Sequence, residues 1–464
     1  MKENDINLRL RELPAVHELA GQLLEVRPDA PQGAVTESCR RAIEEARSVV
    51  LEGGRPPSPE QLVLAAADML DTLAGSSMTD VINATGVVLH TALGRACLPE
   101  SAVAAVTRVA RGYSVLQWDR ETGKRGHRDI HTERLICELA GSEAATVANN
   151  NAGATLLVLS ALARGREVVV SRGQLVEIGG SFRIPDVMKQ SGAVMREVGC
   201  TNRTHLRDYR EAITENTAAI LRVHPSNYRI KGFSSEVPLE QLVELGREFG
   251  IPVVDDLGAG SYIDLKHFGL PSEPTVRGSI ETGASVVTSS GDKLIGGPQA
   301  GIITGEEKYI RMIKKHPLAR ALRVGKLTIA ALEASLALFR EGRDYLVENH
   351  PLYRMFSIST GELRKTAEEF VAMLDLPGSC SAEVIRTDSY TGSGSLPDYA
   401  IPSVGVGLRT PDGEALARKL RLGDPAVASR IEEGLLKLDM RTLQPGEPSL
   451  LAGLVNDAAG ELWG

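Results

Sequence analysis

The sequence has few aromatic residues and no paired cysteine motif. Phe, Trp and Tyr make up 4% of the 464 residues, so a buried core must depend on Leu, Val, Ile and Ala. The five cysteines stand singly along the chain and form no CxxC pair. A zinc ribbon or a redox dithiol is therefore not expected, and we expect no metal site. Sparse, odd-numbered cysteine is typical of a protein from a reducing compartment.

Long apolar runs and a strong charge of one sign are also missing. No run reaches the ~20 residues that a membrane-spanning helix needs. The first five residues, Met-Lys-Glu-Asn-Asp, form no apolar signal segment. The net charge of −8 gives no basic footprint of the kind that marks many nucleic-acid-binding domains. We therefore expect a soluble, cytoplasmic protein with no membrane partner, and composition alone points to no nucleic acid.

Residues 1–78 predict a small helical domain. Apolar residues recur at three- and four-residue steps over 6–24, which favours one amphipathic helix. A second helix is predicted over 34–51, with Thr36 as its cap. After a Gly- and Pro-rich break, Ser58 and Pro59 are placed to cap and begin a third helix. Taken alone, this segment would be interpreted as a dimerisation or docking module.

From residue 79 onward, β-branched apolar runs alternate with helical patterns. Such alternation implies an α/β fold with a mostly parallel sheet covered on both faces. We expect a large domain over 79–335 and a smaller α/β domain over 336–464, linked by a long helical pattern at 321–339. The predicted strands are 145–148, 167–171, 194–198, 218–223, 252–255, 285–289 and 300–304, and helices at 153–163, 205–214 and 238–249 lie between them.

One strand end carries a single lysine. The apolar run at 284–288 stops in small residues, and Lys293 follows within Ser-Ser-Gly-Asp-Lys-Leu-Ile-Gly-Gly-Pro. Small neighbours leave room beside the amine, as a Schiff-base lysine requires. From this stretch alone, a surface lysine in a glycine-rich turn is an equal alternative.

Three other strand ends carry polar loops, and ligands bind at this edge of such sheets. The loop at 149–155 opens a helix with small residues, which suits a phosphate. Two carboxylates end another strand, but alternation allows only one of them to face a ligand. Each loop alone could be a cap or a turn. The order of phosphate loop, polar loop, aspartate and lysine nevertheless indicates a fold-type I pyridoxal phosphate enzyme. The candidate cofactor-binding residues are Asn151, Ala152, Gly153, Ser226, Asn227, and Asp255 or Asp256.

The chain resembles the bacterial selenocysteine synthases, the L-seryl-tRNA(Sec) selenium transferases. The resemblance rests on long blocks that extend through most of the chain. They include Ile-Asn-Ala-Thr-Gly-Val-Val-Leu-His-Thr at 82–91 and Ser-Gly-Asp-Lys-Leu at 290–294. Further blocks lie at 93–96, 125–129, 168–188, 201–205, 316–323 and 392–397.

The resemblance implies roles for particular residues. Lys293 is expected to carry pyridoxal 5′-phosphate, and Asp256 rather than Asp255 to contact the ring nitrogen. Asp292 and Ser290 are expected beside the cofactor. The resemblance also implies that three arginines bind the phosphate-bearing selenium donor: Arg95, Arg320 and Arg323.

The resemblance further implies conversion of seryl-tRNA(Sec) to selenocysteinyl-tRNA(Sec) with selenophosphate, through a cofactor-bound aminoacrylyl intermediate. The helical domain over 1–78 is expected to grip the tRNA, and the chain to assemble as a homodecamer, a ring of dimers. The alternatives are a related lyase or transferase acting on a free amino acid, and a tRNA-binding protein without catalysis. The chain departs from the family pattern near the cofactor at Ala92, Gly153 and Ala259.

Overall fold

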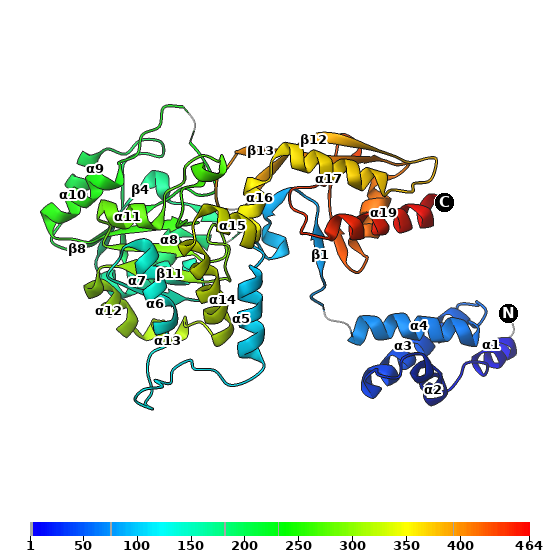
Figure 1. Cartoon of the computed structure of the whole chain (residues 1–464). Helices are drawn as coiled ribbons and strands as arrows, with labels where there is room; N and C mark the ends of the chain where they lie inside the picture. The colour runs from blue at the N-terminus through cyan, green and yellow to red at the C-terminus, as the bar shows by residue number, and fades with distance from the viewer. Residues whose placement is uncertain (1–2, 75–76, 181, 231, 393) are drawn as a thin grey trace. The chain divides into compact units, whose positions relative to one another are not determined.

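A computed structural model describes residues 3–74, 77–180, 182–230, 232–392 and 394–464 (Figure 1). Ser181 and Ser393, which belong to the family blocks, lie outside the described residues. The chain forms two compact units, Met1–Asp80 and Val81–Gly464.

The first unit consists of helices around one apolar core. They are α1 (Glu3–Leu10), α2 (Val16–Val26), α3 (Gln32–Leu51) and α4 (Pro59–Ala74). Buried side chains from α2, α3 and α4, among them Leu19, Val35 and Leu62, form this core. The predicted start of α4 is confirmed, since the Gln61 amide donates to Ser58 Oγ at 3.3 Å.

Two details of this unit differ from expectation. The single helix predicted over 6–24 is two helices, because Pro14 lacks an amide hydrogen and disfavours a helical conformation in the residue before it. Thr36 is not a cap. It lies inside α3, where its hydroxyl donates to the Gln32 carbonyl at 2.9 Å, and the helix begins after Pro31.

The second unit is built on a seven-stranded sheet of order β3-β11-β10-β9-β8-β4-β7. β11 pairs antiparallel with both β3 and β10, and the other strand pairs of the sheet are parallel, so the prediction of a mostly parallel sheet is confirmed. All seven predicted strands form near their expected positions. They are β3 (Ala144–Ala148), β4 (Glu167–Ser171), β7 (Val194–Val198), β8 (Thr217–Val223), β9 (Val253–Gly258), β10 (Val286–Ser290) and β11 (Gly301–Gly305).

Helices cover both faces of this sheet (Figure 1). Successive strand residues point to opposite faces, so Val168 and Val170 pack against one helical layer and Val169 against the other. The first layer is α7 (Asn151–Ala163), α8 (Ile184–Ser191) and α12 (Glu307–Lys315); the second is α9 (Leu206–Ala212), α10 (Leu239–Phe249) and α11 (Val276–Thr282).

The helix predicted over 321–339 is interrupted. α13 (Pro317–Ala321) ends at its first residue, and α14 (Lys326–Ala337) begins after a gap of four residues, 322–325. In the gap, the Leu322 carbonyl accepts from the Asn149 amide at 2.8 Å, and Arg323 forms a bridge with Ala148. These backbone contacts with the end of β3 replace helical hydrogen bonds. Around this region lie α5 (Glu100–Ala110), α6 (Ile130–Ala140), η1 (Thr91–Leu93), η2 (Arg172–Gln174), β5 (Glu177–Ile178), β6 (Phe182–Arg183), η3 (Leu265–Phe268) and η4 (Leu338–Arg340).

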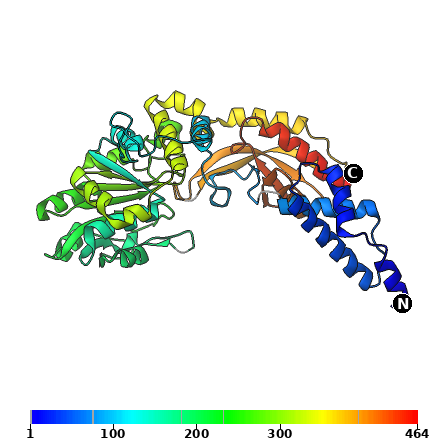
Figure 2. The same cartoon turned by 90° about the horizontal axis from the view of Figure 1, so that it is seen from below.

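A second sheet has the order β15-β16-β13-β12-β2. Its long strands β12 (Ser381–Gly392) and β13 (Ala400–Arg409) pack against α17 (Thr360–Ala372), which contacts α19 (Glu447–Trp463), as Figure 2 shows in orange, yellow and red. The other elements here are β14 (Ala426–Ala428), β15 (Arg430–Glu432), β16 (Leu435–Asp439), α15 (Arg343–Asn349), α16 (Pro351–Ser357) and α18 (Gly413–Arg421).

Residues 81–89 pair with C-terminal strands. β2 (Val87–Leu89) joins the second sheet beside β12, and β1 (Val81–Asn83) pairs with β14 in a separate two-stranded sheet. The sequence placed these residues at the start of the large domain, because a local pattern does not reveal a partner more than 300 residues away. Within the described part of the chain, no helix has the length and hydropathy needed to cross a membrane.

Candidate active site

A cavity of about 320 Å³ lies at the carboxyl ends of the central strands. Its lining includes Ser226 after β8, Asp256 within β9, and Ser290 and Lys293 at and after β10. The first turn of α7 contributes Asn151 and Ala152 as well. The fold therefore brings together the four loops that the sequence singled out, in the manner of parallel α/β sheets.

Lys293 is buried at this cavity, with 7% of its surface exposed. Burial lowers the pKa of its amine, because an ammonium ion loses its water there, and the nearby Arg95 cation lowers it further. The carboxylates of Asp292 and Asp256 act in the opposite direction. A neutral amine is the form that can attack a carbonyl or accept a proton, so the surroundings favour the reactive form.

Arg95 reaches the cavity from the loop after β2. Its guanidinium donates to Asp292 Oδ2 at 2.5 Å. The backbone of Arg95 is left-handed, with φ of 66°, and its amide donates to the His90 carbonyl at 3.0 Å. A non-glycine residue in this conformation costs about 1 kcal/mol or more, and such strain clusters at active sites and ligand-binding segments.

Asp255 and Asp256 point to opposite sides of β9, as alternation predicts. Asp255 faces away from the cavity and pairs with Arg222 at 2.8 Å, while Ser279 also donates to it. Asp256 lines the cavity and accepts from Asn151 Nδ2 at 2.8 Å and Thr155 Oγ1 at 2.9 Å. Burial raises the pKa of Asp256, and these donors oppose the shift.

The loop at the start of α7 is capped by its own side chain. Asn150 Oδ1 accepts from the Gly153 amide at 2.8 Å. Gly153 itself does not line the cavity, because its α-carbon faces Leu322, whose Cδ2 would lie 3.2 Å from a β-carbon there. Gly153 therefore serves helix packing, and Asn150 to Ala152 form the edge of the cavity.

Ser226 and Asn227 have different surroundings in the structure. Ser226 is buried at the cavity, and among the described residues its hydroxyl has no hydrogen-bond partner. The same holds for Asn151 Oδ1. Asn227 is exposed, does not line the cavity and donates to the Glu177 carbonyl at 3.1 Å. The Ser226 hydroxyl is thus available to a ligand, whereas Asn227 stabilises the loop that it belongs to through its hydrogen bond to Glu177.

Arg320 and Arg323 line a different cavity, of about 590 Å³. Arg125, Arg128, Arg311, Lys314 and Lys315 also line it, against the acids Asp129, Glu133 and Glu307. Burial and the neighbouring Arg323 and Arg125 lower the pKa of Arg128, so positive charge is concentrated here. Within one chain the structure does not place these two predicted arginines in the Lys293 cavity.

Sequence reasoning missed several residues around Lys293. Thr155 lies one helical turn after Asn151, a spacing that could have identified it. Gly394 lies against the lysine, because a β-carbon there would be 2.5 Å from Lys293 Nζ. His224 lines the cavity and pairs through Nε2 with the buried Glu273 at 3.0 Å. The last two contacts join distant segments and leave no local signal.

Pyridoxal phosphate fits the residues of this cavity. A buried amine with a lowered pKa is present for the aldehyde, and a buried carboxylate for the ring nitrogen. The amino end of α7 and the unpartnered Ser226 hydroxyl suit the phosphate. No cluster of three or more His, Cys, Asp or Glu among the described residues is arranged to hold a metal ion.

Comparison with known proteins agrees with this geometry. Residues 81–444 match the family model described as L-seryl-tRNA selenium transferase. The chain is 43% identical to the L-seryl-tRNA(Sec) selenium transferase of Caldanaerobacter subterraneus subsp. tengcongensis, over 97% of this chain and 98% of that one. It is 44% identical to the protein of that name from Aquifex aeolicus, over 94% and 95%.

Among solved structures, D-glucosaminate-6-phosphate ammonia-lyase shares the fold, with a TM-score of 0.58 and 22% identity. The match covers 84% of this chain and 98% of that one. The predicted fold class, a fold-type I α/β enzyme with a mostly parallel central sheet, is confirmed. The family match extends over most of the second unit and the relatives over nearly the full length, so the chain belongs to the L-seryl-tRNA selenium transferase family.

Proposed function

We propose that this chain converts L-seryl-tRNA(Sec) to L-selenocysteinyl-tRNA(Sec), with pyridoxal phosphate as cofactor and selenophosphate as selenium donor. The observation that carries the proposal is the cavity in which Lys293 and Asp256 meet. Family membership supports the substrate, since the relatives are named for it. Because the proposed substrate is a charged tRNA, we propose that the reaction takes place in the cytoplasm.

Lys293 would hold the cofactor and then act as the proton carrier. When bound, pyridoxal phosphate supplies an electron sink for the α-carbon of the serine. The Lys293 amine, whose pKa is lowered by burial and by Arg95, can take the α-proton on Nζ. It can return the proton to the α-carbon after the serine hydroxyl has left as water and selenium from selenophosphate has bonded to the β-carbon, with phosphate released. Gly394 lies over the amine, which keeps water from that side of it.

Asp256 would contact the ring nitrogen. Among the described residues, no lysine or arginine forms an ion pair with it within 4 Å. A carboxylate that is only 3% exposed needs a cation or loses its charge. A protonated ring nitrogen would supply that cation, and Asn151 and Thr155 fix the carboxylate so that it faces the cavity.

We propose that Arg320 and Arg323 bind the selenium donor's phosphate in a cavity completed by a second chain. Both are exposed in a strongly basic cavity, and a planar guanidinium suits a phosphate. A homo-oligomer, which the sequence resemblance predicts as a homodecamer, would let these arginines serve the Lys293 of another chain.

Mixing two inactive variants tests this sharing. Lys293→Ala and Arg323→Ala should each lose activity, but co-expressed chains that exchange partners should regain about a quarter of the wild-type rate if each site uses both chains of a dimer. The control mixture combines Lys293→Ala with Arg311→Ala, a change at the same cavity, in place of Arg323→Ala. An active Arg323→Ala protein, or a mixture that stays inactive although mixed oligomers form, would contradict the proposal.

We propose that the first unit docks the tRNA. It has its own core, and the exposed Arg41, Glu45 and Asp68 lie beside exposed Leu73 and half-buried Met69. A protein lacking residues 1–78 should keep its cofactor absorbance and lose at least about tenfold in kcat/KM for seryl-tRNA(Sec), because binding energy from remote parts of a substrate contributes to the rate. The assay is formation of selenocysteinyl-tRNA(Sec). Unchanged kcat/KM in the shortened protein would refute the docking role.

A further inference from the structure

Two neighbouring strands of the second sheet lead to Lys293. β2 and β12 are parallel, with Leu89 opposite Gly392. After β2 the chain turns through η1 to Arg95, which pairs with Asp292. After β12 it reaches Gly394, whose added β-carbon would lie 2.5 Å from Lys293 Nζ. The position of these two strands therefore decides what surrounds the amine.

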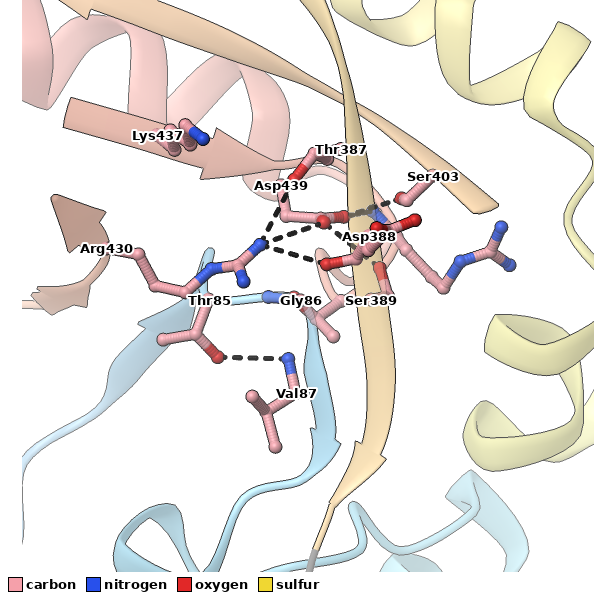
Figure 3. Close-up of polar contacts among 12 residues, drawn as sticks. Thr85, Gly86, Val87, Thr387, Asp388, Ser389, Ser403, Arg430, Lys437 and Asp439 are labelled. Carbon is pink, nitrogen blue, oxygen red and sulfur yellow. Dashed lines mark hydrogen bonds and ion pairs between the residues drawn. The ribbon is translucent and has the colours of Figure 1, made fainter. Parts of the chain in front are cut away.

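The carboxylate of Asp439 lies beside the beginning of β2 and the later part of β12. Asp439 is fully buried at the end of β16 (Figure 3). Asp439 Oδ2 accepts from Ser389 Oγ of β12 at 3.0 Å, and Oδ1 accepts from Ser403 Oγ of β13 at 2.8 Å. The Arg441 amide also donates to Oδ1, at 3.0 Å. One side chain thus holds two strands of the sheet and the turn that follows β16.

The same residue fixes the chain before β2. The Asp439 amide donates to the Ala84 carbonyl at 2.9 Å. Gly86 lies against the carboxylate so closely that a β-carbon there would be 2.5 Å from Asp439 Oδ2, and its φ is +75°. The Gly86 amide donates to Thr442 Oγ1 at 3.1 Å, and the Thr442 hydroxyl donates to the Asn83 carbonyl at 2.6 Å. Asn83, Ala84 and Gly86 are therefore all hydrogen-bonded to Asp439 or Thr442 of the turn at 439–442.

Burying a carboxylate inside a sheet costs free energy, because the charge loses its hydration. Its burial raises the pKa of Asp439, and the cation nearest to it, Arg430, is 3.7 Å from Oδ2 and also donates to Thr387 and to the Asp388 carbonyl (Figure 3). An apolar side chain of similar size would avoid this desolvation. What the carboxylate adds is direction: its oxygens accept hydrogen bonds from chosen strands, which a methyl group cannot do.

We propose that Asp439 is a positioning residue that, through Gly86 and Ser389, sets the Arg95 loop and the Gly394 turn against Lys293. Arg95 and Gly394 follow Gly86 and Ser389 along β2 and β12 and lie beyond the ends of those strands. Loss of the carboxylate should therefore loosen both loops together. The inference depends on the proposed function only for the meaning given to Lys293.

Hydrogen–deuterium exchange of the full-length protein tests this without substrate. Asp439→Asn places an amide where three donors converge, and Gly86→Ala inserts a methyl group against the carboxylate from the other side. Both variants should exchange at least about tenfold faster than wild type in peptides covering 90–96 and 391–397. Ser403→Ala, which removes one donor, should show the same pattern more weakly and serves if the stronger variants fail to fold.

Leu416→Ala is the matched control. Leu416 is fully buried on α18 in the same core as Val404 and Leu438, so its truncation leaves a cavity in this part of the chain without touching the Asp439 contacts. It should leave exchange over 90–96 and 391–397 unchanged. The proposal fails if Leu416→Ala raises exchange there as much as Asp439→Asn does, or if Asp439→Asn leaves both peptides at the wild-type rate.

A kinetic measurement separates positioning from stability. Folded Asp439→Asn should lose about tenfold in kcat while KM for seryl-tRNA(Sec) stays within about twofold, because the amine is misplaced and remote tRNA contacts remain. An unchanged kcat would overturn the proposal. If the variants show the expected faster exchange but the wild-type protein transfers no selenium, the proposed function is refuted and the positioning role of Asp439 still holds.

Discussion

Replacement of Lys293 by alanine is expected to abolish selenium transfer, with a loss of at least about 10³-fold in kcat. The reason is that one amine both holds the cofactor and carries the α-proton. Lys293 is only 7% exposed and its pKa is lowered, which argues against the alternative of a solvent-exposed lysine in a turn. Purified Lys293→Ala protein should also lack the visible absorbance band of a lysine-bound pyridoxal phosphate.

Lys308→Ala provides the control for this result. Its side chain is 61% exposed and pairs with Glu306 outside the cavity. This variant should keep both the absorbance band and the rate. A Lys293→Ala protein that retains the band and more than about a tenth of the wild-type rate would show that another group holds the cofactor.

Asp256→Asn is expected to lower kcat by about 10²-fold or more, because a neutral amide cannot stabilise a protonated ring nitrogen. The fold should survive, since Asn151 and Thr155 can still contact an oxygen at this position. The measurement is the rate of selenocysteinyl-tRNA(Sec) formation at saturating substrate, together with the melting temperature.

The neighbouring Asp255→Asn should behave in the opposite way. It breaks a buried pair with Arg222, which is worth about 3–5 kcal/mol when one partner is removed, so the melting temperature should fall. The folded fraction should retain its catalytic rate. If instead Asp255→Asn abolishes turnover and Asp256→Asn does not, the assignment of the two carboxylates is reversed.

The core of the second unit was readable from local sequence. A parallel strand that is buried on both faces must be apolar on both, so runs such as 167–171 and 218–223 can be recognised as strands from the sequence. The strand-end positions of Ser226, Asp256 and Lys293 follow from the same alternation, because parallel strands expose their carboxyl ends at one edge. For this reason the predicted order of loops and the observed cavity agree.

Features that depend on distant contacts were not readable. The break at 322–325 arises because Arg323 pairs with Ala148, an interaction that no helical pattern shows. Gly394 approaches Lys293 from about 100 residues further along the chain, and Asp439 approaches Gly86 from about 350 residues further along. Arg320 and Arg323 line a cavity apart from that of Lys293 within one chain, and the second chain that we propose to complete their site could not be read from spacing within the first.

The central claim is that the Lys293 cavity acts on serine carried by tRNA. The direct test supplies full-length protein with selenophosphate and either seryl-tRNA(Sec) or free L-serine, and measures selenium incorporated into each. We predict selenocysteinyl-tRNA(Sec) as product and a kcat/KM for free serine at least about 10³-fold lower, since the tRNA supplies most of the binding energy. Equal or faster selenium transfer to free serine would contradict this function.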